Sequence, residues 1–590
     1  MPKVQSKTRG QFDKVDESGT KVRCKLCSAV LTTGGGTSNM LSHLKRKHSE
    51  IVSTQTNSSI SSGDNNDSVS TIEQSLSPNF KEIDEALTLM LATDFQPFSM
   101  VDDKGFRNFV RHINPNYRIP EKRTIRYELM PKLFNELKAK LKRILSDIDN
   151  LSLTTDVWTS NSMESYITIT VHFFYRDDLK SCVLTTTLLT ESHTADHLKD
   201  VVHQIFTEWE IRDKVICITT DNGANIVKMV RLLGLRSMPC FAHTLNLVVE
   251  YSLKVPGLID LIEKCKKIVK YFKKSNIATL TLRKEQKERN PNVEPLQLIQ
   301  EVRTRWNSVY YMIKRILKLI DSITAAQRKL PQAPDIISPE EENILKDVVI
   351  LLDIFEQATE MISGDQYPTS SLIIPIIYGL FDNIQSLGPR VSITVGTIFL
   401  QTLKENMNNH LLDYESRTVC RISTILHPVF RNSFRHLNNK LAAKEAVKAE
   451  INNIIRVRNL PQVTDIDTLS IASTSDTGRP DLLGFLKKNL NNGGITAATA
   501  INLIKMYTET QFPHNSHNWD DVVQFWKFNK HLEPLDEIAF KYLAVPATSV
   551  RSERVFSTTG HILNDRRNML RHDAIDMLCF LNQNQNLLSL

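Results

Sequence analysis

Residues 151–156 read LSLTTD, and two further runs of β-branched residues follow, YITITVHFFY (166–175) and CVLTTTLLT (182–190). The breaks between these runs are short and polar, which predicts an antiparallel meander of three strands. A helical pattern over about 195–210 comes next, and then KVICITTD (214–221), an apolar strand that ends in an acid. A strand that follows a crossover helix pairs in parallel, and a right-handed crossover places it beside the first strand. The sequence therefore predicts an α/β sheet in which the first and fourth strands are neighbours.

Two acids end these neighbouring strands. Asp156 closes the first strand and Asp221 closes the fourth, each directly after two threonines. Carboxylates that meet at one sheet edge repel each other unless divalent cations bind between them. Two such cations activate a water or a 3′-hydroxyl and stabilise the leaving oxygen of a phosphodiester. Either Asp alone is commonly a turn residue, but the matching contexts predict a site for Mg²⁺ or Mn²⁺.

The rest of the 590-residue chain divides by composition. Residues 51–78 and about 462–480 are rich in Ser, Thr, Asn and Asp, so they bury too little apolar surface to fold and are predicted to be disordered. Helical spacing dominates most of the remainder. The predicted parts are a zinc module at 1–50, a disordered linker at 51–78, a helical subdomain at 79–148, the first part of the α/β core at 149–245, a helical insertion at 246–500 and a C-terminal helical region at 501–590.

The overall composition excludes several classes of protein. Hydrophobic residues at 41% and charged residues at 24% exclude a wholly disordered or collagen-like chain. No run of 18 apolar residues occurs, so neither a transmembrane helix nor a membrane partner is expected. The opening residues, MPKVQSKTRGQFDK, predict no secretory signal, and eight cysteines without such a signal predict reduced thiols in a reducing compartment.

A zinc site is predicted early in the sequence. Cys24 and Cys27 are followed by His43 and His48, in the spacing C-x2-C-x15-H-x4-H. Two thiolates from a tight turn and two imidazoles about one helical turn apart complete a tetrahedral Zn²⁺ site with no open position. A module of this size depends on such a structural ion to fold.

Positive charge is concentrated in two blocks. Residues 1–50 hold ten Lys and Arg against four Asp and Glu, and residues 264–290 hold ten against two. Separated basic blocks indicate a polyanionic partner, with DNA as the first candidate, although a solvated helix face is an equal alternative for 264–290. Salt-dependent phosphate contacts are predicted for Arg23, Lys25, Lys45, Arg46 and Lys47.

Several stretches make the chain resemble the hAT transposase superfamily and the domesticated BED-finger proteins derived from it. They are TTDVWTS, TTDNGANIVK, PCFAHTLNLVV, TRWNSVYYM and YLAVPATSVRSERVFSTTG, and together they run from residue 151 to about 585. The zinc module resembles a BED finger through its four ligands, its G-G-T-S-N run and the upstream Phe12. The resemblance implies a multidomain α/β fold: a BED finger, an RNase H-like core interrupted by a long all-helical insertion, and a C-terminal helical hAT dimerisation region.

The resemblance also implies roles that spacing alone does not reveal. Glu553, in Ser-Glu-Arg, is implied as the catalytic carboxylate that completes the set begun by the two aspartates. Trp306 is implied to stabilise a base flipped from flanking DNA while Arg305 holds a phosphate. His243 is implied to lie near the scissile phosphate. Without the resemblance, Trp306 is more typical of a core than of a DNA contact, a core is an equal alternative for His243, and Glu553 is typical of a helix start.

Apolar residues of the C-terminal region predict either an internal core or a subunit interface. The resemblance favours the interface, in a homodimer or a higher homo-oligomer. The residues concerned are Trp526, Leu543, Val545, Val555, Phe556, Leu578 and Phe580.

Together these features predict a zinc-dependent, sequence-specific, dimeric DNA-binding protein that acts on double-stranded DNA in the nucleus. The resemblance implies DNA transposition by Mg²⁺- or Mn²⁺-dependent strand cleavage and transfer. The alternative is a domesticated, catalytically silent regulator of transcription that keeps the finger and the dimer. Structural Zn²⁺ is common to both hypotheses, whereas catalytic Mg²⁺ or Mn²⁺ belongs only to the first.

Overall fold

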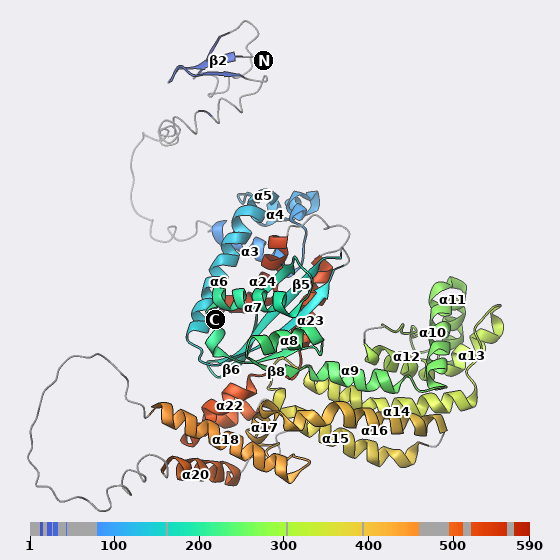
Figure 1. Ribbon diagram of the computed structural model, residues 1–590. Coiled ribbons are helices and arrows are strands. Elements are labelled where there is room, and N and C mark those ends of the chain that lie inside the picture. Colours follow the sequence, from blue (N-terminus) through green and yellow to red (C-terminus); the bar gives the residue numbers. More distant parts are fainter. Residues whose placement is uncertain are drawn as a thin grey trace, which may run out of the picture. The chain divides into compact units, whose positions relative to one another are not determined.

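The chain forms two compact units, Met1–Pro78 and Asn79–Leu590, which are described separately (Figure 1). The computed structural model describes residues 12–15, 21–25, 27–32, 43, 80–160, 163–302, 305–391, 394–458, 495–510, 521–562 and 572–589. The predicted linker at 51–78 and the predicted break near 462–480 lie outside these residues.

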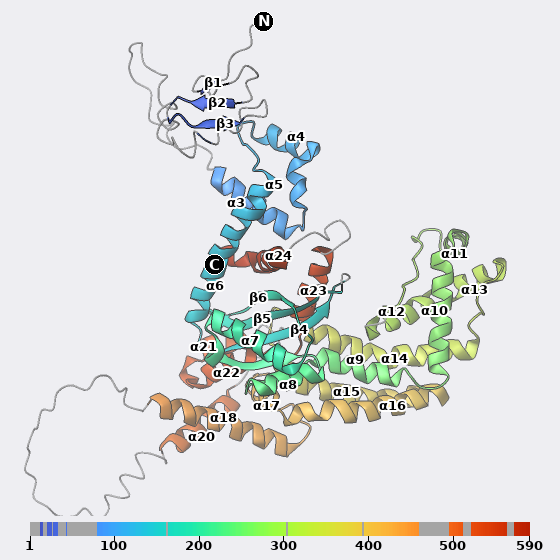
Figure 2. The ribbon, with the colours of Figure 1, turned by 45° about the horizontal axis from the view of Figure 1, so that its top comes forward.

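The first unit contains a small antiparallel sheet whose strands follow chain order (Figure 2). Its strands are β1 (Phe12–Lys14), β2 (Lys21–Cys24) and β3 (Val30–Thr32). Because side chains alternate along a strand, Val22 and Cys24 of β2 face inward against Phe12, whereas Arg23 is exposed. This alternation buries one of the predicted zinc ligands in a core of only a few apolar residues.

The second unit is built on a five-stranded sheet in the order β6-β5-β4-β7-β8. The first three strands form the predicted antiparallel meander, and β7 pairs in parallel with β4, so the predicted neighbours are confirmed. A fifth strand, with the sequence RSMP, was not predicted because it has no β-branched residue and ends in proline. The strands are β4 (Leu151–Thr159), β5 (Ser165–Tyr175), β6 (Asp178–Leu189), β7 (Val215–Thr220) and β8 (Arg236–Pro239).

Helices from both ends of the unit cover the sheet. Helix α7 is the crossover between β6 and β7; it begins where the Thr194 hydroxyl accepts a hydrogen bond from the His197 amide, and it ends at Glu210 in the left-handed region. The apolar faces of α6, α7, α8 and α24 share one core with β4 and β5. These helices are α6 (Met130–Ser146), α7 (Ala195–Trp209), α8 (Ala224–Leu232) and α24 (His572–Asn584).

Strand β6 is at the edge of the sheet, and α24 covers part of its exposed backbone. The Asp576 carboxylate accepts a hydrogen bond from the Thr186 amide at 2.6 Å, and the Asn584 side chain bonds both the amide and the carbonyl of Val183. Satisfied edge groups cannot recruit a strand from another molecule. Residues from the end of the sequence therefore complete a sheet that begins about 400 residues earlier.

Short helices precede the sheet, where the sequence predicts a helical subdomain. Leu87, Leu91, Val101 and Ile125 form a small core of their own there. The helices are α3 (Phe80–Thr93), α4 (Lys104–Ile113) and α5 (Lys122–Thr124).

A long run of helices interrupts the sheet-bearing part, and α9, α14, α15 and α16 lie side by side in it (Figure 1, Figure 2). Helix α14 begins at a capping box, in which Ser338 and Glu341 satisfy each other's backbone amides. The helices are α9 (Phe241–Ser252), α10 (Leu258–Lys274), α11 (Asn276–Arg289), α12 (Trp306–Lys318), α13 (Ile320–Lys329), α14 (Pro339–Ile362), α15 (Ile373–Leu387), α16 (Thr394–Leu411), α17 (Thr418–Ile425), α18 (Leu437–Arg458), α20 (Ile495–Glu509), α21 (Asp521–Phe528) and α22 (Leu535–Leu543).

Two further sequence predictions concern burial and membranes. The six cysteines outside the zinc module are buried free thiols, as predicted: Cys182, Cys217, Cys240, Cys265, Cys420 and Cys579. Among the helices that the structure describes, none combines the length and apolarity that a bilayer crossing requires.

The described apolar C-terminal residues are buried within the single chain, as the internal-core alternative predicts. Trp526, Val545 and Phe580 are fully buried within a single chain, and Leu543, Val555 and Leu578 are at most 2% exposed. The side chain of Phe556 lies outside the described residues. These residues fill the sheet core and the helical core, because the C-terminal segment returns to the sheet.

Phe580→Ala is expected to lower the free energy of unfolding by about 3–5 kcal/mol, since it removes a fully buried ring. The ring packs edge-on against Phe134 at 5.0 Å and near Trp209 at 6.3 Å. Urea unfolding followed by tryptophan fluorescence would measure the loss. Phe528→Ala is the matched control, because Phe528 is 82% exposed. A dimer that dissociates at unchanged stability in the Phe580 variant would contradict the core assignment.

Candidate active site and zinc centre

The sheet register brings Asp156 and Asp221 to the same level of two neighbouring strands. Thr154 of β4 pairs with Thr219 of β7, and each aspartate lies two residues further along its strand. Side chains two residues apart share a face, so each acid lies on the same face as its threonine. Asp221 directly follows β7, as predicted, but Asp156 does not end β4, which continues to Thr159. Asp156 instead lies just beyond the last residue of β4 that pairs with β7.

Helix α23 (Val550–Ile562) brings Glu553 to this face of the sheet. Its Ser552 hydroxyl is hydrogen-bonded to the hydroxyls of Thr154 at 2.9 Å and Thr170 at 3.3 Å. Ser552 is fully buried, so these bonds fix the first turn of the helix against β4 and β5. Glu553, in the same turn, faces Asp156 and Asp221 closely enough to interact with both electrostatically.

The proximity of the three carboxylates, together with burial, makes ionisation of Asp156 and Glu553 less favourable. Burial raises the pKa of Asp156 to about 7, and repulsion by Glu553 and then by Asp221 adds to the effect. Burial also raises the pKa of Glu553, against the opposing influence of Arg305 and His243. Partly buried acids that interact in this way are typical of sites that bind cations or transfer protons.

Three converging carboxylates are a suitable donor set for Mg²⁺ or Mn²⁺, which prefer oxygen ligands. Their oxygens are not all within 4.8 Å of one another; among the residues described, only Cys24, Cys27 and His43 form such a group. A bound divalent cation would also offset the repulsion that raises the pKa of Asp156.

Asp156→Asn is expected to stabilise the metal-free protein more at pH 8 than at pH 5, by about 2 kcal/mol. The pKa of Asp156 is raised from 3.8 to about 7, so between these values the unfolded state has released this proton while the native state keeps it, and stability falls as the pH rises through that window. Asn cannot ionise and avoids this loss. Urea unfolding at both pH values, in EDTA, measures the difference, and all five tryptophans report on residues 79–590. An equal effect at both pH values would contradict a raised pKa.

In the first unit, three of the four predicted zinc ligands come together. The ligand atoms of Cys24, Cys27 and His43 all lie within 4.8 Å of one another, and Cys27 Sγ is 3.2 Å from His43 Nε2. Phe12 packs edge-on against the His43 ring at 6.1 Å, which places the predicted aromatic residue beside the ligands. Two thiols and an imidazole suit Zn²⁺. The fourth predicted ligand, His48, lies outside the described residues.

Four family models match the sequence. They are the BED zinc finger at residues 12–49, the ZBED1 RNase-like domain at 154–240, the ZBED1 RNase-like helical domain at 238–350 and the hAT family C-terminal dimerisation region at 505–585. By these matches the chain is similar to the BED-finger relatives of the hAT transposases.

Curated relatives of this hAT-type chain are distant but extensive. Zinc finger BED domain-containing protein 4 of Homo sapiens is 24% identical over 99% of this chain and 52% of that protein. Putative AC transposase of Zea mays is 25% identical, over 82% of this chain and 62% of that protein. Putative transcriptional regulator tpeD of Talaromyces stipitatus is 23% identical, over 97% of this chain and 70% of that protein. The chain thus spans about half to two-thirds of the first two relatives' own length.

The matches confirm several predictions made from the hAT resemblance. The BED finger, the RNase-like parts and the hAT dimerisation region that the resemblance implied each have a matching family model. A BED finger implies DNA binding, and a hAT dimerisation region implies oligomerisation.

Residues predicted to contact DNA divide into two groups. His243 lies in the first turn of α9, and Arg305 is exposed just before α12. Both side chains interact electrostatically with Glu553 and lower its pKa, so basic residues lie beside the three acids. Trp306 is only 5% exposed and packs against Tyr310 and Phe355, which favours a core role in this structure. Its backbone amide donates to the Asn246 side chain at 3.1 Å, tying the start of α12 to α9.

In the finger, Arg23 and Lys25 are exposed on β2 and just beyond it, and Lys25 lies 3.4 Å from Asp13. The other three predicted phosphate contacts, Lys45, Arg46 and Lys47, lie outside the described residues.

Cys240 has a structural environment. It is fully buried, its Sγ accepts a hydrogen bond from the Ser549 amide at 3.3 Å, and burial raises the pKa of its thiol to about 11. Together with the Phe241 amide, which donates to the Ala547 carbonyl at 2.9 Å, it ties the start of α9 to the segment before α23.

In the second basic block, residues 264–290, half of the Lys and Arg side chains form ion pairs with acids. Lys264 pairs with Glu341 at 2.7 Å, Lys266 with Glu301 at 3.0 Å, and Lys284, Lys287 and Arg289 also have acidic partners. The remaining cations are exposed and form no ion pair within the described chain: Lys267, Lys270, Lys273, Lys274 and Arg283. Positive charge available to a polyanion is therefore concentrated on α10.

Sequence reasoning missed the residues that hold the site together. Thr154 lies within TTDVWTS and Ser552 within YLAVPATSVRSERVFSTTG, but neither motif reveals that the two hydroxyls contact each other. Hydrogen bonds between distant segments leave no periodic pattern in the sequence.

Proposed function

We propose that this chain is a DNA-processing protein of the hAT transposase type, which cleaves and joins DNA strands in a reaction that depends on Mg²⁺ or Mn²⁺. The observation that carries the proposal is the convergence of three acids: Asp156 from β4, Asp221 from the end of β7 and Glu553 from α23. Their interaction contributes to the raised pKa of Asp156, which is about 7. Acids from segments more than 300 residues apart rarely share a buried site without a function.

In this proposal the three carboxylates would hold the divalent cations, which would supply Lewis acidity at the phosphodiester and lower the pKa of the attacking hydroxyl. Arg305 and His243 face Glu553 and are placed to bind and orient the phosphate that bears the scissile bond. The fixed positions of Asp156 and Asp221 on adjacent strands keep the site preorganised, because parallel strands restrict their separation.

The remaining parts of the proposal concern recognition. The BED finger, with structural Zn²⁺, would bind a double-stranded DNA site through Arg23, Lys25 and the predicted basic residues that follow. The C-terminal region would hold a homodimer or a higher homo-oligomer, which is supported by its match to a hAT dimerisation region. We place the activity in the nucleus, where such DNA is found.

Strand cleavage of supercoiled plasmid by the purified full chain, with Mn²⁺ or Mg²⁺ and with EDTA, tests the proposal. We expect nicked circles that form only with the divalent cation. Folded protein that binds DNA yet leaves plasmid and candidate flanking ends intact with either ion would overturn the catalytic proposal.

A second candidate is a regulator of transcription that keeps the finger and no longer cleaves DNA. Relatives with names of this kind favour it, including the transcriptional regulator tpeD, which covers 97% of this chain. The retained carboxylate set favours the first candidate, since a protein without catalysis has no use for the repulsion among them.

A further inference from the structure

We propose that Asp365, in the loop after α14, is a positioning residue for Glu553. It binds two arginines that flank Glu553 on α23 and thereby couples the helical insertion to the acid site. This inference rests on the proposed catalytic role of Glu553. Asp365 lies beyond residues 238–350, the part of the insertion that matches a family model.

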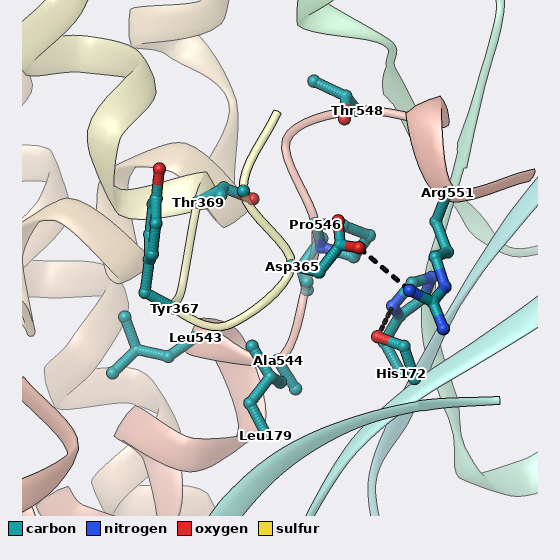
Figure 3. A pocket seen from close by; sticks show the side chains of 13 residues that line it. His172, Leu179, Asp365, Tyr367, Thr369, Leu543, Ala544, Pro546, Thr548 and Arg551 are labelled. Carbon is teal, nitrogen blue, oxygen red and sulfur yellow. Dashed lines mark hydrogen bonds and ion pairs between the residues drawn. The ribbon is translucent and has the colours of Figure 1, made fainter. Parts of the chain in front are cut away.

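The contacts converge on one carboxylate oxygen. Asp365 Oδ2 accepts hydrogen bonds from Arg551 Nη1 at 2.9 Å and from Arg554 Nη1 at 2.5 Å. Arg554 Nη2 also donates to the Ser363 carbonyl at 2.8 Å, on the same loop. Figure 3 shows the Asp365 carboxylate directed at the Arg551 side chain, which descends from the start of α23.

The geometry of α23 explains why this contact bears on Glu553. Arg551 and Arg554 are three residues apart, so they lie on the same side of the helix, while Glu553 lies on another side with the other acids. Ser552 contacts the sheet at the same turn. The sheet and the loop thus hold the helix from two directions, and together they restrict its rotation about its own axis. Rotation is the movement that would displace Glu553 from Asp156.

The positive charge at the start of α23 explains why an acid is needed at the position of Asp365. Two guanidinium groups in the first turn of a helix are repelled by each other and by the positive end of the helix dipole. Asp365 is the one ion-pair partner of Arg551 within the described chain. The side chains of Asp365 and Arg551 are 19% and 24% exposed, so solvent screens their attraction less than at a free surface. Charge-assisted bonds of this kind are strong and directional.

The loop that carries Asp365 is itself held in place. A Cβ on Gly364 would lie 2.4 Å from the Tyr367 ring, so the ring packs directly on the glycine, and the Tyr367 hydroxyl donates to the Met361 carbonyl at 2.6 Å. Thr369 Oγ1 accepts a hydrogen bond from the Ala547 amide at 2.9 Å, which ties the loop to the segment leading into α23. A rigid loop can transmit position, which a mobile one cannot.

The surroundings favour a positioning contact over a ligand site. Asp365, Arg551 and His172 line a cavity of about 30 Å³ (Figure 3), which is too small for an organic ligand. His172 is engaged on both ring nitrogens, by Ser181 at 2.8 Å and Thr154 at 3.0 Å, and burial lowers its pKa to about 3. The neutral imidazole therefore does not compete with the arginines for the Asp365 carboxylate.

Mn²⁺ affinity of the full chain, measured by electron paramagnetic resonance of free Mn²⁺, tests the inference without cleavage of DNA. We expect Asp365→Asn to weaken Mn²⁺ binding about tenfold, the scale seen for residues that orient metal ligands. Asp365→Glu keeps the charge and should recover most of the affinity. Asp382→Asn is the matched control, because Asp382 is exposed on α15 and forms no ion pair among the described residues.

The double variant Asp365→Asn/Arg554→Gln adds a comparison of Mn²⁺ affinities that distinguishes the positioning role from a purely structural one. If the two residues act through one contact, the double variant should bind Mn²⁺ no more weakly than Asp365→Asn alone. A general loss of stability would instead lower the urea midpoint and leave the affinity of folded protein unchanged. Should Asp365→Asn fail to fold, Arg554→Gln carries the same test, because the Arg554 side chain is 50% exposed.

The outcomes separate this inference from the proposed function. Loss of Mn²⁺ affinity in Glu553→Gln, with Asp365→Asn indistinguishable from the Asp382 control, would overturn the positioning role and leave the acid site intact. Unchanged affinity in Glu553→Gln would overturn the metal site, and the positioning role with it.

Discussion

Asp156→Asn and Glu553→Gln are each expected to lower the rate of Mn²⁺-dependent strand cleavage by about a thousandfold or more. Each change removes a carboxylate from a buried site in which three acids interact. A thousandfold loss corresponds to about 4 kcal/mol of transition-state stabilisation, a size expected when a charged group at the reacting centre is removed. Single-turnover nicking of supercoiled plasmid measures the rates.

Asp178→Asn is the matched control for this pair. Its side chain is 63% exposed on β6, so the substitution changes the same charge on the same sheet outside the site. DNA binding by all three variants should match the unaltered chain in a filter-binding assay without metal. Cleavage that persists in the Asp156 and Glu553 variants at the control rate would show that the acids do not catalyse it.

Cys27→Ser is expected to release the zinc and unfold the first unit, with specific DNA binding lost by at least a hundredfold. Structural zinc contributes about 10–16 kcal/mol to folding in small modules, and the core here comprises little more than Phe12, Val22 and Cys24. Serine is a poor ligand, so this energy is lost. Zinc content by mass spectrometry and amide hydrogen exchange over residues 12–32 measure the two effects.

Lys25→Gln serves as the comparison for that substitution. Lys25 is exposed and next to a ligand, so its removal should keep the zinc while reducing DNA affinity and its dependence on salt. The tryptophan fluorescence of residues 79–590 should remain unchanged in both variants. Retention of zinc and of specific binding by Cys27→Ser would contradict the assignment of the ligands.

Local patterns explain why much of the fold was predictable. The β-branched runs and the crossover helix determine β4, β5, β6 and β7, because strand and helix periodicities depend on neighbours within a few residues. Zinc ligands are equally readable, since two short spacings place them. The boundary at Asp156 was wrong because strand length depends on pairing partners, and β5 supports β4 as far as Thr159.

Two features depended on contacts between distant segments. The C-terminal apolar residues are core because α24 returns to cover β6, and no local pattern distinguishes such a core from an interface. Trp306 is likewise buried by Phe355, which lies on a helix of the same insertion. In both cases burial depends on segments that are distant in the chain, which no local pattern reveals.

The sequence by itself determined the mixed sheet, the helical nature of its long interruption, the zinc ligand spacing and the placement of two aspartates on neighbouring strands. Only the tertiary structure decided which residue joins those aspartates and how it is held. Glu553 reaches Asp156 because Ser552 binds Thr154 and the arginines on either side bind Asp365. These contacts join segments that are distant in the chain, and their free energy depends on packing and charge in three dimensions, which residue spacing does not encode.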